Sequence, residues 1–144
     1  MAGLDVDEFR RWYGQGEHTL ASAQRDADAA DFGWACFKAQ QAAEYMVKAL
    51  LRAVGDPALG HSLVRLLETL EQRAGVTVAD PLRRLARTLD RHYIPARYPD
   101  AYPSGMPFEF YDAPTAAEAI QAARRLAGFV REQARAMGIE GIEP

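Results

Sequence analysis

Apolar residues that recur every three or four positions run through most of the chain, and this spacing constrains the fold more than any other feature of the sequence. Such spacing puts the apolar side chains on one face of an α-helix. It predicts helices from about Asp5 to Ala29, Phe32 to Val54, Leu63 to near Gly75, Asp80-Pro81 to Tyr93 and Thr115 to about Met137. Strand patterns are nearly absent, so we expect an all-α fold.

The predicted helices begin and end at residues that favour such boundaries. Asp80 is the expected N-cap ahead of Pro81, and Thr115 and Glu118 have the spacing of a capping box. Gly14 and Gly16 lower the helix propensity of the first helix. Because most connections are short, we expect an up-and-down antiparallel bundle of about five helices.

The exception is the segment 94–114, which contains five prolines and several aromatic residues. Prolines at this density prevent a continuous helix, so the segment is predicted to form a long ordered loop before the last helix. Long ordered loops in small domains often carry function. Candidate site residues are therefore sought first in this loop.

Length and composition limit the class of protein. The 144 residues suit a single domain over 1–144, in which residues 138–144 are expected to fray. No run approaches the ~20 apolar residues of a membrane span, and the acidic N-terminus does not resemble a signal peptide. We therefore expect a cytoplasmic protein without membrane contact. The single cysteine, Cys36, excludes an internal disulfide, and no zinc-like spacing occurs, so we expect neither a metal nor a cofactor.

The net charge of −3 argues against a general polyanion binder, yet the arginines are clustered. Residues 83–97 hold five arginines and one acid, Asp90. Arg83, Arg87 and Arg91 lie four residues apart, which predicts a cationic ridge on the fourth helix. Such a patch can contact phosphate even in an acidic protein.

The second helix carries Gln41, Glu44, Lys48 and Arg52 at spacings of three and four, opposite its apolar stripe. The ordinary interpretation is a solvated face with one Glu44–Lys48 ion pair. The functional alternative puts Lys48 and Arg52 at the rim of an anion-binding cleft.

The start of the loop collects a guanidinium, a carboxylate and phenols in Arg97, Tyr98, Asp100 and Tyr102. Arginine can donate two parallel hydrogen bonds to phosphate, and tyrosines can stack on bases. Alternatively, Arg97 and Asp100 pair and pin the loop. His92 is the candidate general acid or base near the loop, since an ordinary imidazole titrates near neutral pH.

Three segments together resemble the HEPN domain family. Residues 37–51 (FKAQQAAEYMVKALL) resemble its second helix, residues 61–67 (HSLVRLL) the start of its third, and residues 89–100 (LDRHYIPARYPD) the segment after its fourth. Order and spacing agree over roughly residues 7–135. The resemblance implies a helical bundle that commonly forms a homodimer with a cleft between or beside the subunits.

The resemblance also implies functions. Many HEPN domains are metal-independent ribonucleases that use an arginine followed after four to six residues by a histidine. Many accompany a minimal nucleotidyltransferase in a toxin–antitoxin module, and others bind nucleotides or nucleic acid. Arg97 matches the expected arginine, but Tyr102 stands where the histidine is expected.

Two main hypotheses follow. In the first, the chain binds a nucleotide or RNA, with Lys48, Glu44, Arg91, Tyr98, Asp100 and Tyr102 around the ligand. In the second, it cleaves RNA with Arg97 and His92, the histidine coming from the same chain or from the second subunit. A third interpretation is a dimerisation module without a ligand, to which the aromatic residues Trp12, Trp34, Phe108, Phe110 and Tyr111 would contribute.

Overall fold

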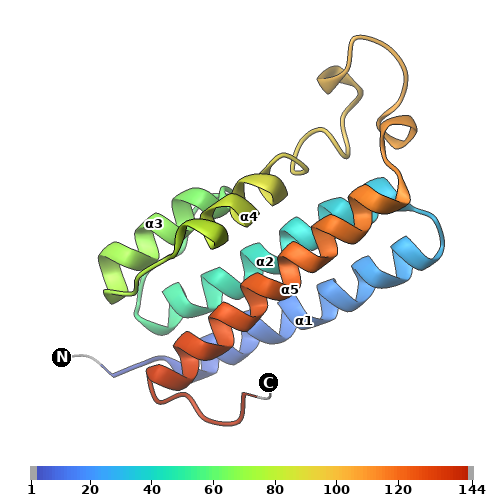
Figure 1. Ribbon diagram of the computed structural model, residues 1–144. Helices are drawn as coiled ribbons and strands as arrows, with labels where there is room; N and C mark the ends of the chain where they lie inside the picture. The colour runs from blue at the N-terminus through green and yellow to red at the C-terminus, as the bar shows by residue number, and fades with distance from the viewer. Residues whose placement is uncertain (1–2, 143–144) are drawn as a thin grey trace.

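The helix at the centre of the fold is α2 (Phe32–Ala53), and it contacts every other helix. The computed structural model describes residues 3–142. The other helices are α1 (Val6–Asp28), α3 (Leu63–Ala74), α4 (Asp80–Asp90) and α5 (Ala113–Ala136). Across the described residues there is no strand, which confirms the all-α prediction. In Figure 1, α1, α2 and α5 lie side by side, and α3 and α4 form a second hairpin against them.

The core is built from the apolar stripes that the spacing predicted. Phe9 and Tyr13 of α1 are buried, as are Leu50 of α2, Leu67 of α3 and Val130 of α5. Cys36 is also buried, and burial raises the pKa of its thiol to about 12. The thiol therefore stays protonated at neutral pH and packs as a small apolar group.

Two predicted helix starts are wrong by a few residues. Helix α4 begins at Asp80 itself, with Ala79 as N-cap, so Asp80 adds its charge to the first turn instead of capping it. Helix α5 begins at Ala113, and the side chain of Asp112 accepts a hydrogen bond of 2.9 Å from the backbone N–H of Thr115. Pro114 is tolerated there because N–H groups in the first turn need no helical partner.

The connection from α2 to α3 turns back along α2. Helix α2 ends at Ala53, but the carbonyl of His61 lies 3.0 Å from Nε2 of Gln40, more than three turns before that end. Gly55 and Gly60 have positive φ values in this connection, and so does Ala58. The result is that residues 54–62 cover one side of α2.

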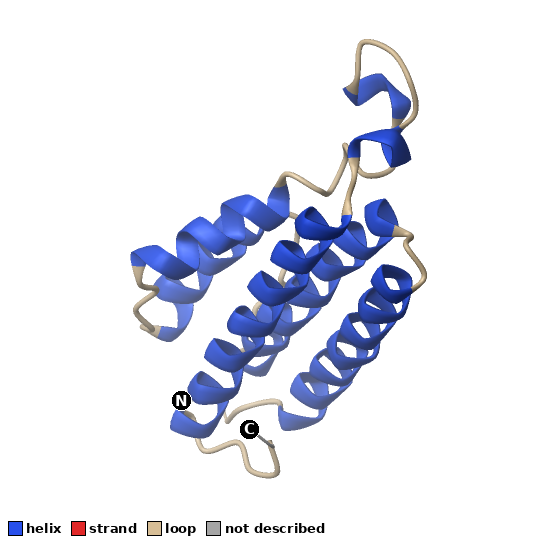
Figure 2. Ribbon diagram, turned by 45° about the vertical axis from the view of Figure 1, so that its right-hand side comes forward, coloured by secondary structure: helices blue, strands red, loops and turns tan. Residues whose placement is uncertain are grey.

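The long loop before α5 projects past the ends of α2 and α5 (Figures 1 and 2). It contains two short 3₁₀ turns, η1 (Pro99–Ala101) and η2 (Pro107–Phe110), and η2 packs against α2. Tyr102 and Phe110 stack with ring centroids 4.1 Å apart, so the loop is held by its own aromatic side chains. The predicted ordered loop is confirmed.

The C-terminal segment that was expected to fray is described as far as residue 142. Ile139 is buried, and Arg10 donates a hydrogen bond to the carbonyl of Glu140. Residues 143–144 lie outside the described part of the chain. No helix within residues 3–142 has the length and apolar character needed to cross a membrane.

Candidate functional site

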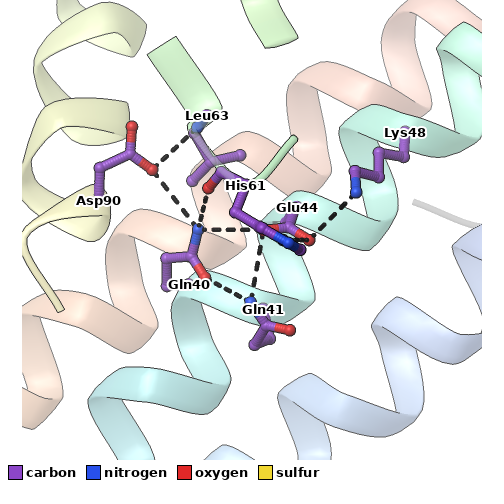
Figure 3. A network of polar contacts seen from close by, with 7 residues as sticks. All are labelled: Gln40, Gln41, Glu44, Lys48, His61, Leu63 and Asp90. Atoms are coloured by element: carbon purple, nitrogen blue, oxygen red, sulfur yellow. Dashed lines mark hydrogen bonds and ion pairs between the residues drawn. The ribbon is translucent and has the colours of Figure 1, made fainter. Parts of the chain in front are cut away.

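A buried carboxylate, Glu44, is at the centre of the most extensive polar network (Figure 3). Its oxygens lie 3.3 Å from Nζ of Lys48, 3.4 Å from Nε2 of Gln41 and 3.2 Å from Nδ1 of His61. Glu44 is 4% exposed and Lys48 7%. The predicted Glu44–Lys48 ion pair is confirmed. The prediction that this face of α2 is solvated is wrong, because residues 54–62 fold back over it.

Asp90, at the end of α4, fixes the start of α3. Its carboxylate accepts hydrogen bonds from the backbone N–H groups of Leu63 at 2.8 Å and Val64 at 3.1 Å, and from the hydroxyl of Ser62 at 3.1 Å. An anion is favoured at this position because the first N–H groups of a helix have no helical partner. Gln40 therefore holds the carbonyl of His61, and Asp90 holds the backbone that follows it.

His61 presents its imidazole to solvent while Glu44 holds one side of the ring. The side chain of His61 is 58% exposed, against 5% for that of Glu44. Its ring stacks on Tyr93, with centroids 4.9 Å apart and an interplanar angle of 15°. Both rings line a hollow of about 490 Å³ together with Arg91 and Ile94. Within residues 3–142, no hydrogen bond engages Nε2 of His61, so this nitrogen is available to a ligand.

Arg97 lies among three aromatic rings. Its guanidinium carbon is 4.1 Å from the ring centroid of Phe37, 4.7 Å from that of Tyr93 and 5.0 Å from that of Tyr98. Its Nε donates a hydrogen bond of 2.9 Å to the carbonyl of Tyr93. The alternative in which Asp100 pairs with Arg97 is not observed, since no ion pair joins Arg97 to a carboxylate in the described chain. The guanidinium charge is therefore available to an anion.

His92 lies beside Tyr111, away from the polar network around Glu44. Its Nδ1 lies 3.0 Å from the hydroxyl of Tyr111, at the base of α5. Burial lowers the pKa of His92, Arg91 lowers it further, and Glu118 acts in the opposite direction. No hydrogen bond joins His92 to Arg97 within residues 3–142. The two predicted catalytic residues thus have different hydrogen-bond partners, the hydroxyl of Tyr111 for His92 and the carbonyl of Tyr93 for Arg97.

The remaining predicted residues divide into two groups. Arg91 lines the same hollow as His61, and Tyr98 lies beside Arg97 with 48% of its surface exposed. Asp100 is exposed on η1, and Tyr102 stacks on Phe110 farther along the loop. The described residues contain no group of three or more side chains arranged to hold a metal ion.

Sequence reasoning missed the structural importance of Gln40, Asp90 and Tyr93. Asp90 is the only acid among the arginines of residues 83–97, and this position could have indicated a structural role for its carboxylate. Two partners of Gln40, His61 and Asp90, lie 21 and 50 residues away along the chain, so no local pattern could have revealed them.

Comparisons with known proteins agree with this architecture. Residues 9–133 match the family model of the HEPN domain. The chain is similar to the crystal structure of TT1696 from Thermus thermophilus, with 42% identity and a TM-score of 0.83, covering 87% of this chain and 97% of that one. It is similar to ST0689, an archaeal HEPN homologue, with 33% identity and a TM-score of 0.73, covering 92% and 98%.

An HEPN domain protein from Thermotoga maritima is 28% identical, with a TM-score of 0.70 and coverage of 87% and 98%. No curated protein matches the chain. The family model spans most of the sequence, and the helical arrangement agrees with that of the solved homologues. The chain therefore belongs to the HEPN domain family.

Proposed function

We propose that this chain binds a nucleotide or RNA, in the cytoplasm, at the cluster formed by His61, Arg91, Tyr93, Arg97 and Tyr98. The observation that carries the proposal is the environment of Arg97, whose guanidinium lies within 5.0 Å of three ring centroids and pairs with no carboxylate among the described residues. A guanidinium is suited to phosphate, and an exposed phenol beside it is suited to stacking on a base. The other predicted contacts, Lys48 and Glu44, act indirectly by holding His61.

Replacement of Arg97 tests the proposal. In Arg97→Gln, the affinity for a fluorescent single-stranded RNA is expected to fall about 10- to 100-fold, the usual effect of one lost hydrogen bond to a charged group. The measurement is fluorescence anisotropy at fixed salt concentration. The affinity of Arg97→Lys is expected to lie between those of wild type and Arg97→Gln, because lysine keeps the charge but loses the planar fork.

The matched control is Arg84→Gln, which removes one positive charge from α4. It should leave the affinity within about twofold of wild type. Equal affinities in Arg97→Gln and Arg84→Gln, with circular dichroism showing both folded, would remove Arg97 from the binding site.

RNA cleavage is the second candidate function, and the His61–Glu44 contact favours it. A buried carboxylate at Nδ1 orients an imidazole whose Nε2 is open to the hollow, an arrangement suited to general acid–base catalysis. The Nδ1 of His92, by contrast, lies 3.0 Å from the hydroxyl of Tyr111 and has no carboxylate partner among the described hydrogen bonds. We propose His61 as the proton-transfer residue of any cleavage activity.

The same labelled RNA distinguishes binding from cleavage. It is incubated with the protein and a metal chelator, and the products are separated on a denaturing gel. If the chain cleaves RNA through His61, His61→Ala should slow the reaction about 10²- to 10⁴-fold, whereas His92→Ala should change it little. Intact RNA after incubation with wild type leaves the binding function alone.

The family resemblance also leads us to propose a minimal nucleotidyltransferase as a partner in a toxin–antitoxin-type module. Tyr98, half-exposed beside Arg97, is the phenol best placed for contact with such a partner, since Tyr102 is stacked on Phe110. The identity of the protein that the neighbouring reading frame encodes tests this proposal. A neighbouring gene for a protein other than a nucleotidyltransferase would argue against it.

A further inference from the structure

A groove between α1 and α5 consists of two adjoining hollows, and both helices contribute side chains to each of them. The first hollow has a volume of about 520 Å³ and the second of about 260 Å³. Gln24 and Arg124 line both hollows, so the two meet at this pair. Apolar side chains line both parts: Leu20, Met46 and Ala127 in the first, and Phe32, Ala117 and Ile120 in the second. No residue of the groove lines the hollow at His61, so the groove is separate from the site proposed above.

Three arginines line the first hollow, and none of them forms an ion pair within residues 3–142. Arg131 donates a hydrogen bond of 3.1 Å from Nη1 to the hydroxyl of Tyr13, and Arg124 donates one of 2.9 Å from Nη2 to the side-chain oxygen of Gln24. The third is Arg25, which is exposed. Neutral partners thus hold two of the guanidinium groups in place, and their positive charge is available to an anion.

The lining of the first hollow has a positive charge and a defined spacing. Glu17 is the one acid that lines it, against three arginines, so an excess of two positive charges remains. Arg124 and Arg131 are seven residues apart, which puts them on one side of α5 at a separation of roughly 10 Å along its axis. Ala127 lies between them on the same side. The groove therefore fits a ligand with two anionic groups about 10 Å apart and apolar groups between them.

We infer that this groove binds an acidic amphipathic helix of a partner protein. On such a helix, two carboxylates seven residues apart share one side at the same separation of roughly 10 Å, and the residues three and four positions after the first carboxylate share that side too. The two carboxylates pair with Arg124 and Arg131, while the apolar residues between them pack against Leu20 and Ala127. This is recognition of a helix by a groove, in which side chains at these spacings anchor the ligand.

The spacing and the apolar lining distinguish this partner from a second copy of the chain and from RNA. No two acids of this sequence are seven residues apart, so none of its own helices offers the required pair. RNA has suitable anions, but its phosphates and sugars bring no aliphatic side chains to cover Leu20 and Met46. Removal of this apolar surface from water favours an amphipathic helix.

A synthetic helical peptide tests this inference. It carries two glutamates seven residues apart, two leucines at the third and fourth positions after the first glutamate, and alanine and glutamine elsewhere. Its binding to wild type, followed by fluorescence anisotropy, should saturate below about 1 mM. A control peptide of the same composition has the second glutamate moved by two positions, which turns it about 200° around the helix. The control peptide, and a third peptide with serines in place of the leucines, should each bind about tenfold more weakly.

Variants of α5 identify the groove as the binding site. Arg124→Gln and Arg131→Gln should each weaken binding of the matching peptide about 3- to 10-fold, because each removes one charge pair. The matched control is Arg125→Gln, since Arg125 is exposed on the same helix and lines neither hollow. It should stay within about twofold of wild type. If circular dichroism shows that a variant does not fold, the three peptides still give the answer with wild type.

Four results overturn the inference. The first is a matching peptide that does not saturate or that binds no better than its shifted control. The second is an affinity of Arg131→Gln for the peptide equal to that of Arg125→Gln. The third is a loss of affinity for single-stranded RNA in Arg131→Gln, which would assign the arginines to RNA. The fourth is a wild-type homodimer that Arg131→Gln dissociates in light scattering, which would assign the groove to a second copy.

Discussion

At the scale of single residues, Glu44 shows how burial changes the role of a charged side chain. Four polar side chains, those of Gln40, Gln41, Lys48 and His61, surround its carboxylate. Removing one partner of a buried ion pair is costly because the other charge stays buried without compensation. The network therefore fixes the Glu44 carboxylate that contacts Nδ1 of His61. Spacing along α2 predicted the Glu44–Lys48 pair, but burial depends on the distant segment 54–62.

His92 gives a pH-dependent prediction at the same scale. Since burial lowers its pKa in the folded chain, the unfolded chain takes up a proton first as the pH falls below the ordinary value of 6.5. The free energy of unfolding should therefore decrease from pH 7 downward until the folded pKa is passed. Each tenfold difference in proton affinity corresponds to about 1.4 kcal/mol.

Urea denaturation of wild type and His92→Gln between pH 7.5 and 5 measures this effect. Glutamine does not titrate, so the stability difference between the two proteins should shift in favour of the variant as the pH falls. A difference that stays constant across this range would show that His92 titrates alike in the folded and unfolded chains.

At the scale of the helices, most of the fold was predictable because each helix has a clear apolar periodicity. The positions of the five helices follow from that spacing, and errors are confined to boundaries such as Asp80 and Ala113. The exact starts depend on which side chain reaches the first N–H groups, and this is a choice among neighbours such as Asp112 and Thr115. The two glycines of α1 have different roles that sequence alone does not separate.

Gly14 and Gly16 give a matched pair of stability predictions. A Cβ at Gly16 would lie 2.6 Å from Cγ of Met46 and 3.0 Å from the carbonyl oxygen of Ala42, whereas a Cβ at Gly14 would have no neighbour within 4 Å. Gly16→Ala should therefore destabilise the protein by about 1–3 kcal/mol, because α1 and α2 must move apart. Gly14→Ala should stabilise it by up to about 1 kcal/mol through helix propensity.

Urea denaturation of both variants at neutral pH provides the comparison. If Gly16→Ala were as stable as Gly14→Ala, the close approach of α1 and α2 at Gly16 would not contribute to stability.

At the scale of the whole molecule, the candidate site could be predicted only in part. The loop before α5 was identified from its prolines, and Arg97 does lie among aromatic rings. The pairing of Arg97 with His92 was not observed within one chain, because α4 ends at Asp90 and the following turn directs His92 toward Tyr111. Local sequence patterns cannot predict contacts between segments far apart in the chain, such as the stacking of His61 on Tyr93.

The projecting loop leads to a prediction about assembly. Met106, Phe108 and Phe110 are 50%, 65% and 51% exposed on this loop, and we propose that a second copy of the chain covers them. Light scattering at micromolar concentration should show a homodimer. Phe108→Ser should weaken dimerisation about 10- to 100-fold, as expected for the loss of one buried aromatic side chain.

The control is Leu59→Ser, which changes an apolar residue that is 81% exposed in the connection between α2 and α3. It should leave the dimer intact. A monomeric wild type would refute the proposed assembly and any site shared between subunits.

The carboxylate of Asp90 has an evolutionary consequence. It ties the last residue of α4 to the first turn of α3, so the turn that leads to Arg97 starts from an anchored point. The opposite end of this hairpin, residues 75–79, lies a full helix length away from that anchor. Insertions or deletions among homologues should therefore accumulate at residues 75–79, where a change in hairpin length does not displace the ligand-facing side chains.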